Sequence, residues 1–445
     1  MILILSFTII FAILVFRQRL KVRRLPPGPT PLPVIGNIPQ LVYQSWRHKG
    51  IVPAFDYFRK KYGNVFTLWL GPFPHISIAD YETSHEVFVK NGNHYKNKVL
   101  PPIFEHFCDG FGLLFANGEI WAEMRRFTML TFRNMGVGRN IMEERLLNEI
   151  DKRCAELNNT EVDGKIIVKH NEFFELITGS FINSILVGQR FEDHNMEEFY
   201  HMRKLINGII EVFTIFDTTT AVWILKYFFP QRYAKSKNGW NGISDYVGQA
   251  AEKRLEDIKS GKYILDEENP KDFIDAFFIK MEKENQSGGH PAYTMKSLKY
   301  TLLDLWTAGH DTTAATLTSG FNQLVNNPEV KEKCREELMK ITNNGSRPLS
   351  LNDRSQTLYL NATIAEIQRH ASILNVNSWK TCDGPTTVNG YQLDSGDIIT
   401  AQMFGNLLLR YDVQPHKKLP STTEQFPFTS AKVPDHSSKL EFVRI

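Results

Sequence analysis

The stretch DLWTAGHDTTAATLTSG, Asp304–Gly320, lies inside a long segment whose pattern is helical, yet its composition is unusual for a helix. Ala308 and Gly309 stand in its middle, where glycine costs about 1 kcal/mol relative to alanine. Such small residues allow another body to lie close to the helix. Asp311 and Thr312 follow them, and an acid beside a hydroxyl can deliver protons. Taken alone, the same residues also fit a tight helix crossing whose hydroxyls bond back to the helix.

Two further patterns at helical spacing lie before and after this stretch. In WAEMRRF, Trp121 and Arg125 are four residues apart and face the same way, so that a ring and a guanidinium can together hold a buried carboxylate. In EIQRH, Glu366 and Arg369 stand at positions i and i+3 of a helix. Each pattern has a plainer alternative, which is a partly exposed cation–π pair for the first and a surface ion pair for the second.

The chain begins with an apolar segment followed by a basic cluster. MILILSFTIIFAILVF, Met1–Phe16, carries no charge, and RQRLKVRR after it holds five basic residues. A membrane span needs about 20 apolar residues, and Leu20 and Val22 extend the apolar face of this shorter run. Because the positive charges follow the apolar run, residues 1–24 are predicted to be an uncleaved membrane anchor, with the rest of the chain in the cytosol. The alternative is a cleaved signal peptide, which carries its positive charges first.

The next segment, LPPGPTPLPVIGN, occupies residues 25–37 and is rich in proline. It cannot be helical and favours stiff extended chain, so we predict a rigid hinge between the anchor and one large domain over residues 38–445. A plain linker is the alternative. Within the domain, residues 62–80 alternate as a β-hairpin, residues 81–370 are mostly helical, and strand-like residues return near the end. The predicted fold class is mainly α with small β-sheets.

Composition narrows the class of protein. The 445 residues are 42% hydrophobic and 12% aromatic, which suffices for a large core, and a net charge of +3 does not suggest a nucleic-acid-binding protein. The four cysteines form no CxxC pair, which argues against a zinc site or a disulfide framework. Such cysteine usage suits a reducing compartment.

The proline hinge, W-x-x-x-R, A-G-x-D-T and E-x-x-R, in this order behind a membrane anchor, resemble the cytochrome P450 family in its animal microsomal branch. The resemblance covers nearly the whole chain. It implies the cytochrome P450 fold, a haem b cofactor and NADPH-dependent monooxygenation, in which one oxygen atom enters an apolar xenobiotic or lipid substrate. It also implies a place in the lipids of the endoplasmic reticulum membrane, with NADPH–cytochrome P450 reductase as the partner that supplies electrons.

The resemblance further implies which residues contact the haem. Trp121 and Arg125 would bond one haem propionate. Lys380 falls where the family often has a basic residue on the other propionate. The helix through Ala308 and Gly309 would cross the distal face of the haem.

By the same resemblance, Asp311 and Thr312 would deliver protons on that distal face. Glu366 and Arg369 would be structural and would lock the helix beneath the haem. Aromatic segments that match the family's substrate pocket suit apolar molecules, although plain core packing explains them equally well.

The family also requires a cysteine ligand to the iron, in a loop of the form F-x-x-G-x-R-x-C-x-G downstream of E-x-x-R. Three cysteines of this chain, Cys108, Cys154 and Cys334, lie upstream of that motif. The fourth, Cys382, follows NVNSWKT, which has none of the required Phe, Gly and Arg. No metal ligand is therefore predicted, and haem could be held only by propionate contacts and apolar packing.

The sequence around Gln402 and Met403 indicates where that loop was lost. GYQLDSGDIITAQ before this junction resembles the family's strand after the E-x-x-R helix, and MFGNLLLRYDVQP after it resembles the end of the last helix. The helix, meander and cysteine loop that belong between them are absent, as a skipped exon or a gene-model deletion would produce. We therefore predict an inactive chain. The alternatives are a membrane-anchored non-enzymatic protein that binds a ligand or partner, and an unstable truncated isoform.

Overall fold

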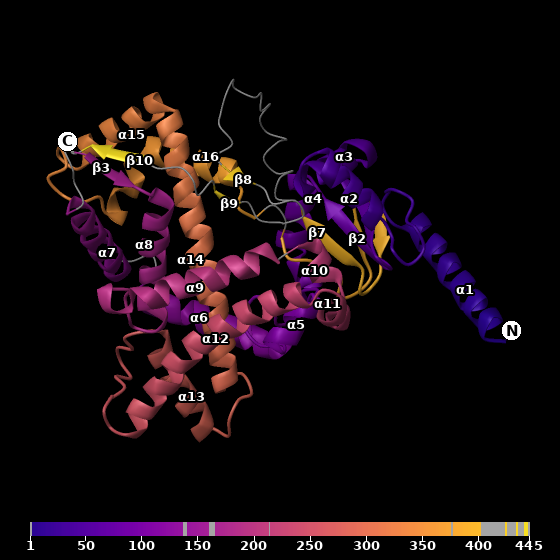
Figure 1. Ribbon diagram of the computed structural model, residues 1–445, viewed down its shortest axis with the longest axis horizontal. Coiled ribbons are helices and arrows are strands. Elements are labelled where there is room, and N and C mark those ends of the chain that lie inside the picture. The colour runs from indigo at the N-terminus through magenta and orange to yellow at the C-terminus, as the bar shows by residue number, and fades with distance from the viewer. Residues whose placement is uncertain are drawn as a thin grey trace.

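The computed structural model describes residues 2–136, 140–159, 165–212, 214–374, 377–401, 423–424, 433–434 and 440–443. Within these ranges the chain is mainly α with small β-sheets, which confirms the predicted fold class (Figure 1). The α-helices are α1 (Ile2–Arg24), α2 (Ile38–Arg47), α3 (Ile51–Tyr62), α4 (Tyr81–His85), α5 (Pro102–Cys108), α6 (Gly118–Asn134), α7 (Asn140–Asn158), α8 (His170–Leu186), α9 (Met196–Glu211), α10 (Ile215–Thr219), α11 (Val222–Phe228), α12 (Pro230–Lys259), α13 (Phe273–Gln286), α14 (Met295–Asn326), α15 (Pro328–Ile341) and α16 (Leu358–Ala371). The strands are β1 (Val65–Leu70), β2 (Phe73–Ile78), β3 (Lys165–Val168), β4 (Lys380–Thr381), β5 (Thr386–Val388), β6 (Tyr391–Leu393), β7 (Ile398–Ala401), β8 (Thr423–Glu424), β9 (Val433–Pro434) and β10 (Leu440–Val443).

Helix α14 contains the stretch Asp304–Gly320 and runs through the middle of the molecule (Figure 1). Its 32 residues rise over about 48 Å at 1.5 Å per residue. The helix begins after Thr294, whose Oγ1 accepts a hydrogen bond from Ser297 N at 3.1 Å, and it ends just before Pro328. It packs against α8, α12 and α16, so the candidate site residues in its middle have fixed neighbours.

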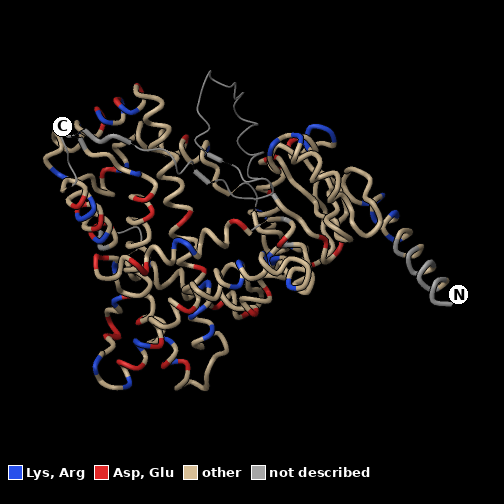
Figure 2. Tube along the Cα trace, viewed as in Figure 1, with Lys and Arg blue, Asp and Glu red and all other residues tan. Residues whose placement is uncertain are grey.

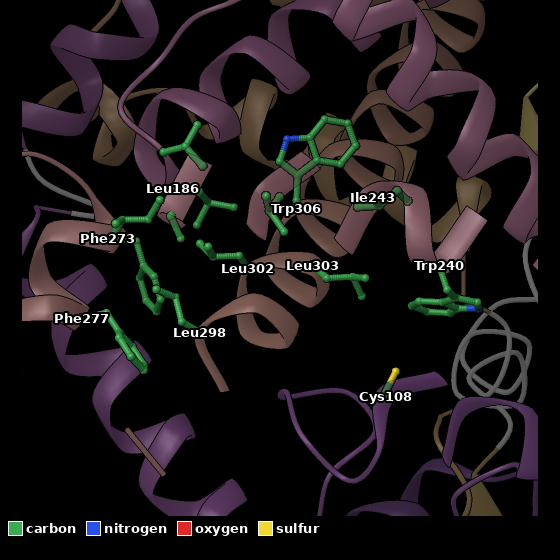
Figure 3. Close-up of a cluster of buried hydrophobic side chains, with 14 of the residues drawn as sticks. Cys108, Leu186, Trp240, Ile243, Phe273, Phe277, Leu298, Leu302, Leu303 and Trp306 are labelled. Atoms are coloured by element: carbon green, nitrogen blue, oxygen red, sulfur yellow. The ribbon is translucent and has the colours of Figure 1, made fainter. Parts of the chain in front are cut away.

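The main core lies along α14. Three of its side chains, Leu298, Leu302 and Trp306, are fully buried and belong to the same hydrophobic cluster as Phe273 and Phe277 of α13. Burial of each large apolar side chain contributes about 1.5–3 kcal/mol. Figure 3 shows part of this core and labels Cys108, Leu186, Trp240, Ile243, Phe273, Phe277, Leu298, Leu302, Leu303 and Trp306.

The largest sheet has the strand order β1–β2–β7–β4. Strands β1 and β2 form the predicted hairpin, which turns at Gly71 with φ of +65°. Strand β2 also pairs in parallel with β7, so that Ile76 lies opposite Ile399. Strand β7 ends at Ala401, and the predicted junction between Gln402 and Met403 lies outside the described residues.

Helix α1 covers most of the predicted anchor and projects from one side of the body (Figure 1). Its basic end, blue in Figure 2, is tied to the turn before β7. Lys21 Nζ lies 2.6 Å from Asp397 Oδ1, and Arg24 pairs with Asp394. Among the described residues, no helix combines the length and the apolarity that crossing a bilayer takes.

The proline-rich segment 25–37 lies against β1. Pro27 O accepts a hydrogen bond from Thr67 N at 2.9 Å. A Cβ added to Gly28 would lie 2.0 Å from Thr67 O, so the close approach of the two backbones requires glycine. The residues predicted to form a hinge are thus held on the sheet by backbone contacts.

Candidate functional site

One face of α6 carries Trp121 and Arg125 together with Asn117, which precedes the helix, at successive spacings of four. Trp121 Nε1 donates to Leu113 O at 3.0 Å, which orients the indole ring. The guanidinium carbon of Arg125 lies 5.8 Å from the centre of that ring. The two predicted residues therefore lie side by side, with the indole half-buried and the arginine exposed.

The structure adds Lys98, which the sequence analysis does not predict. Lys98 Nζ donates to the same Leu113 carbonyl at 2.7 Å and lies 4.7 Å from the centre of the Trp121 ring. Asn117 holds the Lys98 backbone at both ends, since Lys98 N donates to Asn117 Oδ1 at 2.9 Å and Asn117 Nδ2 donates to Lys98 O at 2.8 Å. Lys98 belongs to an irregular segment, where no spacing pattern marks it.

Lys380, which the sequence does predict, lies opposite Lys98 in an isolated antiparallel bridge. The adjoining hydrogen bond from Val99 N to Trp379 O is 2.8 Å long. Directly opposed residues of an antiparallel pair project to the same side, so two lysines share one side of this pairing. Like charges placed in this way repel each other.

We name Lys98, Arg125, Lys380 and the Trp121 ring the cation cluster. Burial lowers the pKa of Lys98 to about 8, and the charges of Lys380 and Arg125 act in the same direction while Asp304 opposes them. Burial, followed by the charge of Arg125, lowers the pKa of Lys380 as well. Among the described residues, none of the three cations forms an ion pair with a carboxylate. The three cations of the cluster thus outnumber the one nearby carboxylate, that of Asp304, and the cluster favours an anionic ligand.

Asp304 connects α14 to this cluster. Its Oδ2 accepts hydrogen bonds from Leu113 N at 2.6 Å and Leu114 N at 2.8 Å. Burial raises the pKa of Asp304 to about 7, although these two backbone donors oppose the shift. Gly112, with φ of +94°, passes so close that a Cβ there would lie 2.4 Å from Asp304 Oδ2. The backbone of Leu113 thus contacts both α14 and the cation cluster. Its N–H donates to Asp304, and its carbonyl accepts from Lys98 and Trp121.

The small residues in the middle of α14 face two ways. Ala308 and Thr312 follow Asp304 at intervals of four, and Thr312 Oγ1 donates to Ala308 O at 2.7 Å, the back-bond considered from the sequence. Gly309 lies against α8 instead, because a Cβ there would be 3.0 Å from Ile182 Cδ1. Gly309 therefore allows a close helix crossing, while Ala308 stays exposed on another side.

Asp311 belongs to a charged group between α8, α9 and α14. Burial raises the pKa of Asp311 to about 6, and the charge of Arg203 opposes the shift. Arg203 Nε lies 2.5 Å from Glu175 Oε2, and burial raises the pKa of Glu175 to about 7. His310 Nε2 lies 3.0 Å from Glu175 O. One guanidinium thus pairs with the buried Glu175 and acts electrostatically on the half-buried Asp311. No sequence pattern predicts this group, because its members come from three helices.

Glu366 and Arg369 of α16 form the predicted i, i+3 ion pair. Arg369 Nε donates to Glu366 Oε2 at 2.7 Å, and hydrogen bonds from Arg369 lower the pKa of Glu366. His370 Nε2 lies 3.1 Å from the same carboxylate. The Glu366 side chain is 55% exposed against 16% for Arg369, so the pair lies partly at a surface.

All four cysteines lie in described residues, and the surroundings of Cys108, Cys154 and Cys382 disfavour the thiolate. Cys382 is buried beside the main sheet, and burial raises its pKa to about 12. Burial also raises the pKa of Cys108 and of Cys154. Cys334 is buried and donates to Thr363 Oγ1 at 3.4 Å. In the part of the chain that the structure describes, no three His, Cys, Asp or Glu side chains are placed to hold a metal ion.

These surroundings can be compared with what a haem needs. Its two propionates need positive charge, and the cation cluster brings together three cations that form no ion pair with a carboxylate among the described residues. Its iron, in the resembling family, needs a cysteine thiolate, which forms where the thiol pKa is lowered. The described residues therefore fit the propionates and do not fit the iron, and no reaction step at the iron follows from them.

Comparison with known proteins gives one consistent result. The family model described as Cytochrome P450 matches residues 26–408 of this chain. The chain is 46% identical to "Probable cytochrome P450 cyp-35D1" of Caenorhabditis elegans across 100% of both proteins. It is 31% identical to "Cytochrome P450 2C55" of Rattus norvegicus over 90% of this chain and 79% of that protein. It is 32% identical to "Cytochrome P450 2B4" of Oryctolagus cuniculus over 88% of this chain and 77% of that protein.

The first of these alignments also measures a difference in length. It extends over 501 positions and includes the whole of both proteins, whereas this chain has 445 residues. At least 56 aligned positions (501 minus 445) therefore hold a residue in the nematode protein and none in this chain.

Proposed function

This chain belongs to the cytochrome P450 family, and we propose that its 445-residue form is a haem-binding member without thiolate-dependent monooxygenation. The family is one of haem-dependent monooxygenases. The haem, when bound, supplies the oxygen chemistry, and the protein supplies its ligand and its surroundings. The loss of one ligand thus removes the family reaction while most of the fold remains.

The absence of any cysteine after Cys382 carries this proposal. A cysteine thiolate would hold the haem iron and would supply the electron density that the oxygen chemistry of the family requires. Cys382 itself is buried beside the sheet, and burial raises its pKa to about 12, which opposes a role as ligand. The other three cysteines precede E-x-x-R, on the wrong side of that motif for the family.

Two observations support the loss of an internal segment, which we propose to lie at Gln402–Met403 on the ground of the flanking sequence motifs. The alignment with the nematode relative leaves at least 56 of its 501 positions without a residue of this chain (501 minus 445). On α16, Leu358 is 71% exposed and Ile364 is 43% exposed, as expected if a segment that covers this helix in the family is missing. A skipped exon or a gene-model deletion accounts for the intact flanks.

The surviving residues keep the roles that the family suggests. Trp121, Arg125 and Lys380 would hold the propionates, and Lys98 is added to them because it contacts the same Trp121 ring. Ala308 and Gly309 would let the haem or α8 lie close to α14. Asp311 and Thr312 would provide protons. Glu366 and Arg369 would stabilise α16.

We assign the chain to the endoplasmic reticulum membrane, with residues 1–24 as the anchor, residues 25–37 as the hinge and residues 38–445 as a cytosolic domain. The exposed side chains of Leu5, Ile9 and Ile13 on α1 support this assignment, since an apolar helix surface needs an apolar environment. A full-length product of the gene would receive electrons from NADPH–cytochrome P450 reductase and oxidise an apolar substrate.

A second candidate function is ligand binding without catalysis. The intact cation cluster favours it over a merely unstable truncated isoform, because the cluster offers an anion site that requires no thiolate. Under this alternative the chain would bind a ligand or partner at the membrane.

The carbon monoxide complex of the reduced protein tests the proposal. The far-red-shifted Soret band of the family comes from the thiolate opposite carbon monoxide, so we expect no such band and no NADPH-driven turnover in the presence of reductase. A thiolate-type band that disappears in Cys382→Ser would contradict the proposal and make Cys382 the ligand.

A further inference from the structure

The cation cluster is built from three separate parts of the chain, and the protein itself holds its most buried cation, Lys98, in place. Lys98 lies in an irregular segment, Arg125 on α6 and Lys380 on β4. Asn117 holds the Lys98 backbone with hydrogen bonds of 2.9 and 2.8 Å, and Leu113 O accepts from Lys98 Nζ at 2.7 Å. Groups held in this way lose little conformational freedom when a ligand binds.

The charges of the cluster identify the kind of ligand. Lys98 is 9% exposed and lies opposite Lys380, while Arg125 adds a third positive charge. In the described part of the chain, no carboxylate forms an ion pair with any of the three. A ligand with one acidic group would leave most of this charge uncompensated, whereas two carboxylates on one molecule would balance most of it.

The face of α14 that continues from Asp304 bears on the shape of the ligand. Asp304 binds the loop beside the cluster, and Ala308 and Thr312 follow it on the same helical face, about 6 and 12 Å further along the axis. Both are small, and Ala308 is exposed. A flat apolar molecule with two acidic groups at one edge would match this arrangement.

We propose, as an extension of the proposed function, that this chain binds tetrapyrrole dicarboxylates as a class and that the metal at the centre of the ring adds little to the affinity. The reason is that the site offers ligands to the carboxylates of the tetrapyrrole but not to its central metal. The carboxylate end is complete in Lys98, Arg125 and Lys380, whereas the described residues offer no thiolate to the metal.

The first test compares ligands on the whole 445-residue chain in detergent, with quenching of its seven tryptophans as the signal. The ligands are metal-free protoporphyrin IX, zinc protoporphyrin IX, haemin and protoporphyrin IX dimethyl ester. We expect the first three dissociation constants to agree within about tenfold and the diester to bind more than about tenfold more weakly. A wider spread among the first three, or binding of the diester as tight as that of the diacid, would overturn the proposal.

The second test changes the protein. Lys98→Gln, Arg125→Gln and Lys380→Gln should each weaken the binding of metal-free protoporphyrin IX about tenfold, since each removes a charge-assisted contact. The control is Arg126→Gln, because Arg126 is next to Arg125 on α6 but pairs with Glu123. Unchanged binding in all three cluster variants, with circular dichroism equal to that of the control, would rule out the cluster as the site.

The absorption spectrum of the haemin complex separates the two proposals. A thiolate-type spectrum would refute the proposed loss of the ligand. A preference for haemin of more than about tenfold, without that spectrum, would refute only the metal-independent binding and would point to a nitrogen or oxygen ligand.

Discussion

Leu113 offers its carbonyl to two donors, Lys98 Nζ and Trp121 Nε1, while its N–H donates to Asp304 Oδ2. The charge of the cation cluster comes from lysine and arginine side chains, but the carbonyl of one residue orients two of the cluster's four members, Lys98 and Trp121. A backbone group can do this because its position is set by the chain on both sides. Substitution at Leu113 would keep this carbonyl, so the effect of the peptide has to be tested through its partners.

Glu175 and Asp311 make a pH-dependent contribution to stability. Glu175 has a pKa raised by burial to about 7, so between pH 4.5 and 7 the folded chain keeps a proton that the unfolded chain releases. The free energy of unfolding should therefore fall as the pH rises through this range, and Asp311, with a pKa of about 6, acts in the same direction. Glu175→Gln should flatten this dependence by an amount on the order of 2 kcal/mol between pH 5 and 8.

Denaturant unfolding at a series of pH values measures the effect. Glu172→Gln is the matched control, because Glu172 lies 3.6 Å from the same Arg203 but its side chain is 38% exposed. An equal slope in the wild type and in Glu175→Gln would show that Glu175 is ionised throughout the range.

Among the elements, the loop between α5 and α6 depends on α14. Gly112 has φ of +94° and lies against the Asp304 carboxylate, whereas Gly110 has φ of +75° and no atom near its Cβ position. Gly112→Ala should lower the free energy of unfolding by about 2–4 kcal/mol, because it combines backbone strain with displacement of a buried hydrogen-bonded carboxylate. Gly110→Ala adds only the strain and should cost about 1 kcal/mol.

Thermal or denaturant unfolding of the two variants gives this comparison. The difference between them measures the Asp304 contact, since both carry the same substitution in the same loop. Equal losses in the two variants would mean that the contact between this loop and α14 contributes nothing to stability.

For the whole molecule, the proposed anchor predicts its behaviour in membranes. The basic end of α1 is tied to the main sheet through Lys21 and Arg24, so the apolar part of the helix extends from a defined place on the body. Microsomes that contain the expressed chain should retain it after extraction with alkaline carbonate. This treatment releases proteins that are held at the membrane surface by electrostatic contacts, whereas an apolar helix stays in the bilayer. Recovery of the intact chain in the carbonate supernatant would refute the anchor.

The amino-acid sequence by itself determined the features that depend on neighbours along the chain. The spacing of Trp121 and Arg125, the ion pair of Glu366 with Arg369 and the back-bond of Thr312 all follow from the helical repeat, and the structure has them at those places. The β1–β2 hairpin and the mainly α fold class were predictable for the same reason. The roles of these residues in a haem site stay predictions.

Only the tertiary structure decided which distant residues meet. Lys98 faces Lys380 because two extended segments pair, and no local spacing announces that pairing. Likewise, Asp304 reaches the Leu113 peptide only after α14 packs beside the loop, and Arg203 reaches Glu175 only through the packing of α8 and α9. The physical reason is that helical and strand periods arise from local geometry, whereas the charge balance of a buried site depends on contacts between segments far apart in the chain.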